Sequence, residues 1–152
     1  MSSTNPEKAA SRVAINGVML ASLFVVLAVV FLEPEKFSLI VVAEMVLAIP
    51  FLFVSSLAYT KIGYWKEVRF WDSFGYITNT LGNFLLIDSV GLLSYSFSPA
   101  LAYSYFALII LLMLAYSVIN VAYNPKLAYS KALKFAFSTA IVILGGILPL
   151  VF

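Results

Sequence analysis

The chain has 152 residues, of which 63% are hydrophobic and 11% charged, and its formal net charge is +2. Soluble domains are about 45–50% apolar and about 25% charged, so this composition excludes an ordinary soluble domain and indicates an integral membrane protein. Cysteine and histidine are absent, which excludes disulfides, thiolate chemistry and metal or haem centres held by those residues. We therefore expect no cofactor, no metal site and no catalytic residue, and a protein that is not an enzyme.

Five apolar stretches of about 20 residues fill the chain, and a bilayer core about 30 Å thick needs a helix of about that length. The sequence therefore predicts an all-α integral membrane protein, a bundle of five transmembrane helices in one domain over residues 13–152. A polar N-terminal segment over residues 1–12, which we expect to be disordered, precedes it. The expected spans are residues 13–32, 38–59, 76–95, 100–121 and 132–152.

The distribution of basic residues predicts the orientation. Eight of the nine lysines and arginines fall on one side of the expected spans, and only Lys36 falls on the other. Basic residues concentrate in cytoplasmic loops, so we expect a cytoplasmic N-terminus and an external C-terminus, in the cell membrane. The eight are Lys8, Arg12, Lys61, Lys66, Arg69, Lys126, Lys131 and Lys134.

Turns and irregularities mark the first two spans. Gly17 and Ala21 lie four residues apart in the first span, a spacing that lets helices in a membrane approach closely. The residues at 33–36 include Pro34 and predict a tight external turn. Pro50 lies inside the second span, where it removes one backbone hydrogen bond and favours a kink.

The connection over residues 60–75 is rich in aromatic and basic residues. Trp65, Lys66, Arg69 and Trp71 belong to it. Aromatic rings at headgroup level and cations facing anionic lipid are typical of a short amphipathic segment in the cytoplasmic interface. We expect these four side chains to act as interface anchors.

The last two spans are bounded by an external loop at residues 96–99 and a cytoplasmic turn at Asn124 and Pro125. Gly145, Gly146 and Pro149 lie inside the fifth span. These residues either make that helix bendable or permit close packing.

Two carboxyl groups fall inside expected spans, Glu44 in the second and Asp88 in the third. An ionisable group within a bilayer costs about 2.5–3.5 kcal/mol on insertion scales, so it requires a reason. Counted along the two helices, both carboxyls lie at similar depth in the outer half of the membrane. Together they would form a proton or cation site. In the structural alternative each one bonds to a neighbouring hydroxyl or to a partner subunit and joins helices.

A second polar set predicts a helix-packing track. Asp72, Asn79 and Asn83 share one face of the third span, and Asn16 and Asn120 fall in the same cytoplasmic half. Asparagine amides form interhelical hydrogen bonds in lipid. A polar zipper around the third span is one interpretation of this set, and a permeation path is the other.

Two functions follow from these features. The first is a non-catalytic accessory or structural subunit of a larger membrane complex, of energy-conserving or oxidase type. The second is a small homo-oligomeric transporter or channel that uses Glu44 and Asp88. The expected partners are membrane lipid and either other membrane subunits or further copies of this chain. The basic residues are too few and too close to lipid for nucleic-acid binding.

Overall fold

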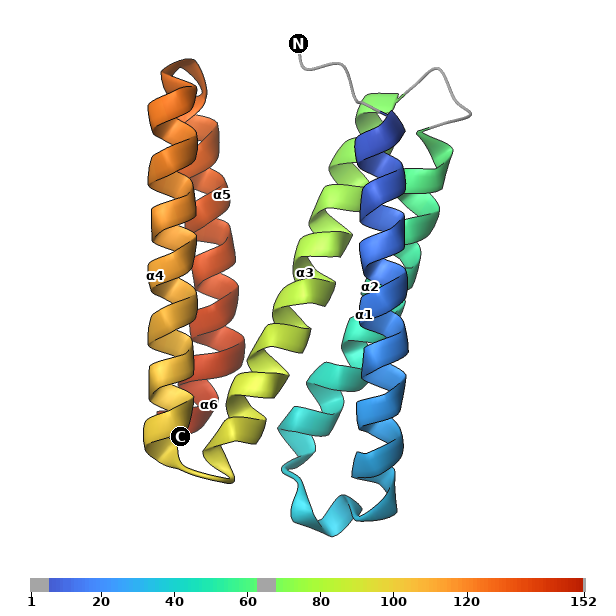
Figure 1. The fold of residues 1–152 in the computed structure, drawn as a ribbon, viewed down its shortest axis with the longest axis vertical. Coiled ribbons are helices and arrows are strands. Elements are labelled where there is room, and N and C mark those ends of the chain that lie inside the picture. The colour runs from blue at the N-terminus through green and yellow to red at the C-terminus, as the bar shows by residue number, and fades with distance from the viewer. Residues whose placement is uncertain (1–5, 63–67, 152) are drawn as a thin grey trace. The chain divides into compact units, whose positions relative to one another are not determined.

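The computed structural model describes residues 6–62 and 68–151, and these are helical almost throughout (Figure 1). The elements in order are α1 (Pro6–Leu32), the 3₁₀ turn η1 (Pro34–Lys36), α2 (Leu39–Lys61), α3 (Val68–Tyr95), α4 (Pro99–Tyr123), the 3₁₀ turn η2 (Pro125–Leu127), α5 (Ala128–Ile141), the π-helical segment η3 (Val142–Ile147) and α6 (Leu148–Val151).

Among the residues that the structure describes, four helical segments are long and apolar enough to cross a membrane, namely Pro6–Leu32, Leu39–Lys61, Pro99–Tyr123 and Ala128–Val151. They confirm the prediction of an all-helical chain with helices of membrane-spanning length. Helix α3 has 28 residues, but polar side chains such as Asp72, Asn79 and Asn83 interrupt its apolar surface. A fifth span along α3 and the orientation of the termini stay predictions.

Two helices begin earlier than expected. Helix α1 begins at Pro6, inside the segment expected to be disordered, because proline suits the first turn of a helix and the acidic Glu7 complements its positive end. Helix α3 runs without a break from Val68. From Val68 onward, the predicted interfacial segment is therefore the first two turns of α3, not a separate element.

Contacts divide the chain into two compact units, Met1–Leu86 and Ile87–Phe152. In the first unit, α1 and α2 lie side by side and antiparallel, joined through η1 (Figure 1). Leu23 and Leu27 of α1 and Met45 of α2 are nearly inaccessible. The beginning of α3 packs against α2, so the unit is a three-helix arrangement in which α1 starts, α2 ends and α3 starts at the same end.

The second unit contains the end of α3, helices α4 and α5, η3 and α6. Helices α4 and α5 form an antiparallel hairpin through η2 (Figure 1). In η3 the Leu148 amide donates to the Ile143 carbonyl, five residues back, which is the π-helical pattern. The nearby Pro149 has no amide hydrogen to donate. The sequence predicted a bendable or closely packed helix at this place, and the structure has a wider, π-helical turn there.

Candidate functional site

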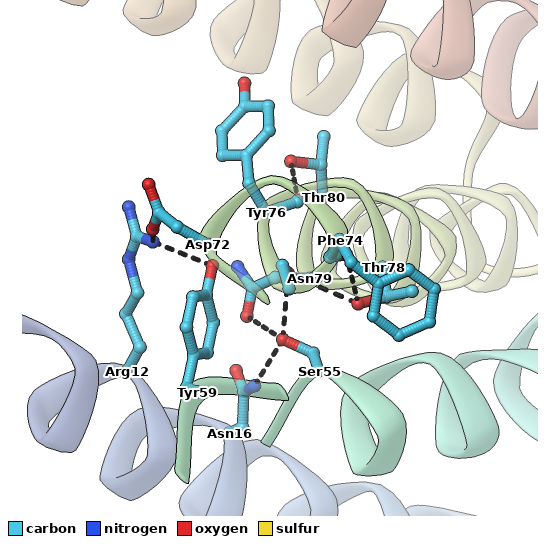
Figure 2. A network of polar contacts seen from close by, with 11 residues as sticks. Arg12, Asn16, Ser55, Tyr59, Asp72, Phe74, Tyr76, Thr78, Asn79 and Thr80 are labelled. Atoms are coloured by element: carbon cyan, nitrogen blue, oxygen red, sulfur yellow. Dashed lines mark hydrogen bonds and ion pairs between the residues drawn. The ribbon is translucent and has the colours of Figure 1, made fainter. Parts of the chain in front are cut away.

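Arg12 links the three helices of the first unit (Figure 2). Its Nη1 donates to the Tyr59 hydroxyl of α2 at 2.8 Å and lies 3.5 Å from Oδ1 of Asp72 on α3. The guanidinium carbon lies 4.8 Å from the centre of the Tyr59 ring, which is within the range of a cation–π interaction. The charge of Arg12 is therefore balanced by a carboxylate and supported by an aromatic ring.

One turn further along α1, Asn16 forms a second set of interhelical contacts (Figure 2). Its Nδ2 lies 3.3 Å from the Ser55 hydroxyl and 3.3 Å from the Ser56 hydroxyl of α2. Ser55 in turn lies 3.1 Å from the Gly75 carbonyl and 3.3 Å from Oδ1 of Asn79, both on α3. A hydroxyl has one proton, so Ser55 donates to one of these oxygens at a time while it accepts from Asn16.

Two glycines of α3 allow α3 to lie close to α2. A Cβ atom at Gly75 would lie 3.0 Å from Cε1 of Tyr59, and one at Gly82 would lie 2.8 Å from Cγ of Leu52. The glycines are seven residues apart and share one face of the helix. Their lack of a side chain brings the α3 backbone within hydrogen-bonding distance of Ser55.

The structure divides the predicted polar track. Asn16 and Asn79 meet at Ser55, and Asp72 lies beside Arg12. The amide oxygen of Asn83 is buried and accepts no hydrogen bond within residues 6–62 and 68–151.

The fifth member, Asn120, lies in the second unit on α4. Its Nδ2 donates to the Tyr116 carbonyl at 2.9 Å, and its Oδ1 accepts from Lys131 of α5 at 3.2 Å. Asn120 therefore connects the two helices of the α4–α5 hairpin, and its place in the predicted track stays a prediction.

Asp88, in the second unit, has a different environment from these bonded groups. It is 0% exposed, and neither of its carboxyl oxygens has a hydrogen-bond partner among the described residues. A Cβ atom at Gly146 would lie 2.9 Å from its Oδ1, so the carboxyl lies directly against the backbone of η3. The hydroxyl of Tyr105 donates to the Ile87 carbonyl at 3.1 Å.

Phe106 of α4 packs against the same glycine of η3 as this carboxyl. A Cβ atom at Gly91 would lie 2.2 Å from Cζ of the ring, and one at Gly146 would lie 2.2 Å from Cε1. The ring is thus held between a glycine of α3 and a glycine of η3, and Phe106 is 2% exposed. The surroundings that these contacts define for Asp88 are an aromatic ring and a glycine backbone.

Glu44, the other predicted carboxyl, is buried in α2 at 6% exposure. It belongs to the first unit and Asp88 to the second, so their pairing stays a prediction. In the parts of the chain that the structure describes, no group of three or more acidic side chains is placed to hold a metal ion.

The predicted interface anchors fall in two places. Trp71 packs against the buried cluster of Ala9, Tyr59 and Ile62, so this ring contributes to the first unit's own packing. Arg69 is exposed in the first turn of α3. Trp65 and Lys66 lie outside the described residues.

The sequence did not single out Arg12, Ser55, Tyr59 or Phe106 as site residues. A signal existed for the first three, since Arg12 and Asn16 are four residues apart on α1, and Ser55 and Tyr59 are four apart on α2. Residues at that spacing share a helix face. Phe106 gave no such signal because it lies within a continuous apolar run.

Comparison of the chain with protein-family models, with curated proteins and with solved structures finds no match. The functional argument therefore depends on the residues described above: a bonded polar network in the first unit and an unbonded buried carboxyl in the second.

Proposed function

We propose that the chain is a non-catalytic, multi-pass protein of the cell membrane that works as a small accessory or structural subunit of a larger membrane complex, of energy-conserving or oxidase type. The proposal includes α3 as a fifth span, a cytoplasmic N-terminus and an external C-terminus. The observation that carries it is the network around Ser55. Its polar groups bond to one another and join α1, α2 and α3, which is a structural use of polarity.

The apolar surface of α4 supports the same proposal. Ala102 and Phe106 are its buried residues, whereas Leu111 is 62% exposed and Tyr116 is 70% exposed. Lipid or the apolar helices of a partner subunit would cover such a surface. A helix with so few contacts inside its own chain gains stability when other membrane helices pack against it.

Gentle extraction from the native membrane tests the proposal, with the mass and composition of the intact particle as the measurement. We expect larger membrane proteins in fixed stoichiometry with this chain. Because the chain has no cysteine, a single cysteine at Leu111 provides a cross-linking site, and one at the buried Ala102 is the matched control. A particle that contains this chain alone would contradict the subunit proposal.

A second candidate function is a small homo-oligomeric transporter or channel for protons or cations that uses Glu44 and Asp88. The environment of Asp88 favours it, because the hydrogen bonds that explain Asn16 and Asn79 have no counterpart at this carboxyl among the described residues. Flux into liposomes is the test. Glu44→Gln or Asp88→Asn should abolish flux while the protein still folds and inserts, and wild-type protein without flux would contradict this candidate.

A further inference from the structure

The carboxyl of Asp88 is buried without the contacts that stabilise a negative charge. Neither oxygen has a hydrogen-bond partner among the described residues, and the side chain is 0% exposed. Burial of a charged carboxylate without partners carries a large desolvation cost. The neutral acid avoids most of that cost, so this environment suits a carboxyl that holds its proton.

The neighbouring groups favour a proton over a metal cation as the ligand. Hard cations such as Ca²⁺ take about six to eight oxygen ligands, whereas Asp88 lies against the Gly146 backbone, which the Phe106 ring also contacts. The Tyr105 hydroxyl donates to the Ile87 carbonyl. A proton needs one carboxyl oxygen and no further ligand.

The ionisable groups near this carboxyl are few. Tyr105 is the titratable group of α4 beside Asp88, and η3 contains no ionisable side chain. In the part of α3 that belongs to the second unit, residues 87–95, the other titratable group is Tyr95, at the end of the helix. None of these is a cation that would stabilise the carboxylate.

The π-helical turn provides a way for this environment to change. A π-helical turn is a local irregularity within an α-helix and is frequent at functional sites. The η3 segment contains Gly145 and Gly146, and Pro149 follows it. If η3 returns to α-helical bonding, its backbone shifts relative to the segments on either side. That shift would move Gly146, whose backbone lies against the Asp88 carboxyl.

We propose that Asp88 is a proton-binding site of the second unit, protonated in the conformation described, and that movement of η3 away from it admits water and releases the proton. Proton binding at Asp88 deepens the second candidate function, the transporter or channel. The role of this proton in transport rests on that proposed function, whereas the binding site itself does not. A proton-loaded Asp88 is equally compatible with a subunit of a larger proton-translocating assembly.

A hydrophobic carbodiimide tests the proposal, because it reacts with protonated carboxyl groups that lie in apolar surroundings. The protein in lipid nanodiscs is treated at several pH values, and the modified residue is located by mass spectrometry. Glu35, an exposed carboxyl in η1, is the internal control. A carboxyl that takes up its proton one pH unit higher than another has a protonated fraction about tenfold larger at neutral pH. We therefore expect at least about tenfold more modification at Asp88 than at Glu35.

Infrared spectroscopy gives an independent measurement on the same sample. We expect the carbonyl stretch of a protonated carboxylic acid, shifted in D₂O, in the wild type and in Glu44→Gln. The part of the signal that belongs to Asp88 should be lost in Asp88→Asn and kept, with altered frequency, in Asp88→Glu. The wild-type carbodiimide result requires no variant, so the test stands even where Asp88→Asn does not fold.

The outcomes separate the site from the transport function. Modification of Asp88 without proton flux into liposomes supports the site and counts against the transporter. Flux with no more modification at Asp88 than at Glu35 overturns the site and leaves transport to another residue. An infrared signal that persists unchanged in folded Asp88→Asn also overturns the proposal.

Discussion

Replacement of Ser55 by alanine tests whether the polar network holds the first unit together. The Ser55 hydroxyl is fully buried and connects α2 to both neighbouring helices. It accepts from Asn16 of α1 at 3.3 Å and donates toward the Gly75 carbonyl or Asn79 of α3 at 3.1 and 3.3 Å. Two interhelical hydrogen bonds are therefore lost together when the oxygen is removed.

The expected loss of stability follows from the free energy that interhelical hydrogen bonds contribute in membranes. An interhelical hydrogen bond contributes about 0.6 kcal/mol on average and about 1.7 kcal/mol at most. Two of them predict a loss of about 1–3 kcal/mol in the free energy of unfolding. The lower part of this range is expected, because Asn16 keeps contacts with the Ser56 hydroxyl and the Leu52 carbonyl.

Ser56→Ala is the matched control. The Ser56 hydroxyl donates to the Leu52 carbonyl inside its own helix at 3.0 Å and accepts only the contact from Asn16. We expect a loss of about 0.5 kcal/mol or less, as for one weak interhelical bond. The measurement is reversible unfolding by SDS titration in mixed micelles, followed by circular dichroism. A Ser55→Ala loss no larger than that of Ser56→Ala would refute the reasoning.

Three further predictions use the same unfolding assay. Gly82→Ala should lower the free energy of unfolding by about 1–3 kcal/mol, because the new methyl group meets Leu52 and overpacks the helix contact. Gly17→Ala is the control. Its methyl group meets nothing within 4 Å, so it should change the stability by less than about 0.5 kcal/mol. Tyr59→Phe should cost about 0.5–1.5 kcal/mol through the lost hydrogen bond from the arginine; an unchanged stability would count against that bond. Gly91→Ala and Phe106→Ala should each destabilise the protein. The double variant should lose at least about 0.5 kcal/mol less than the sum of the two single losses, because the methyl group and the ring compete for one space. Additive losses would contradict the packing.

The helices could be predicted because their causes are local. Apolar runs of membrane-spanning length predicted α1, α2, α4 and the α5–α6 segment. Prolines predicted the breaks, since Pro34, Pro99 and Pro125 each lie at the start of a helix, where a missing amide hydrogen costs nothing. The start of α3 was less predictable because aromatic and charged residues are compatible with both an interfacial segment and a helix.

The contacts between helices could not be predicted because they depend on rotation and neighbour choice. Periodicity places Asn16 on a helix face, but it does not say that this face meets Ser55 instead of another polar group. The seven-residue spacing of Gly75 and Gly82 places both on one helix face, but it does not identify Leu52 and Tyr59 as the side chains packed against that face.

The Ser55 network and Asp88 use buried polarity in opposite ways, and this difference separates structural from functional polarity. In the first unit, Asn16 and Ser55 have several partners each, so removal of either should weaken the fold. In the second, Asp88 has a cost of burial and no hydrogen bond in the described structure to offset it. A buried carboxyl that has no hydrogen bond in the described structure requires another explanation, and proton binding beside a π-helical turn provides one.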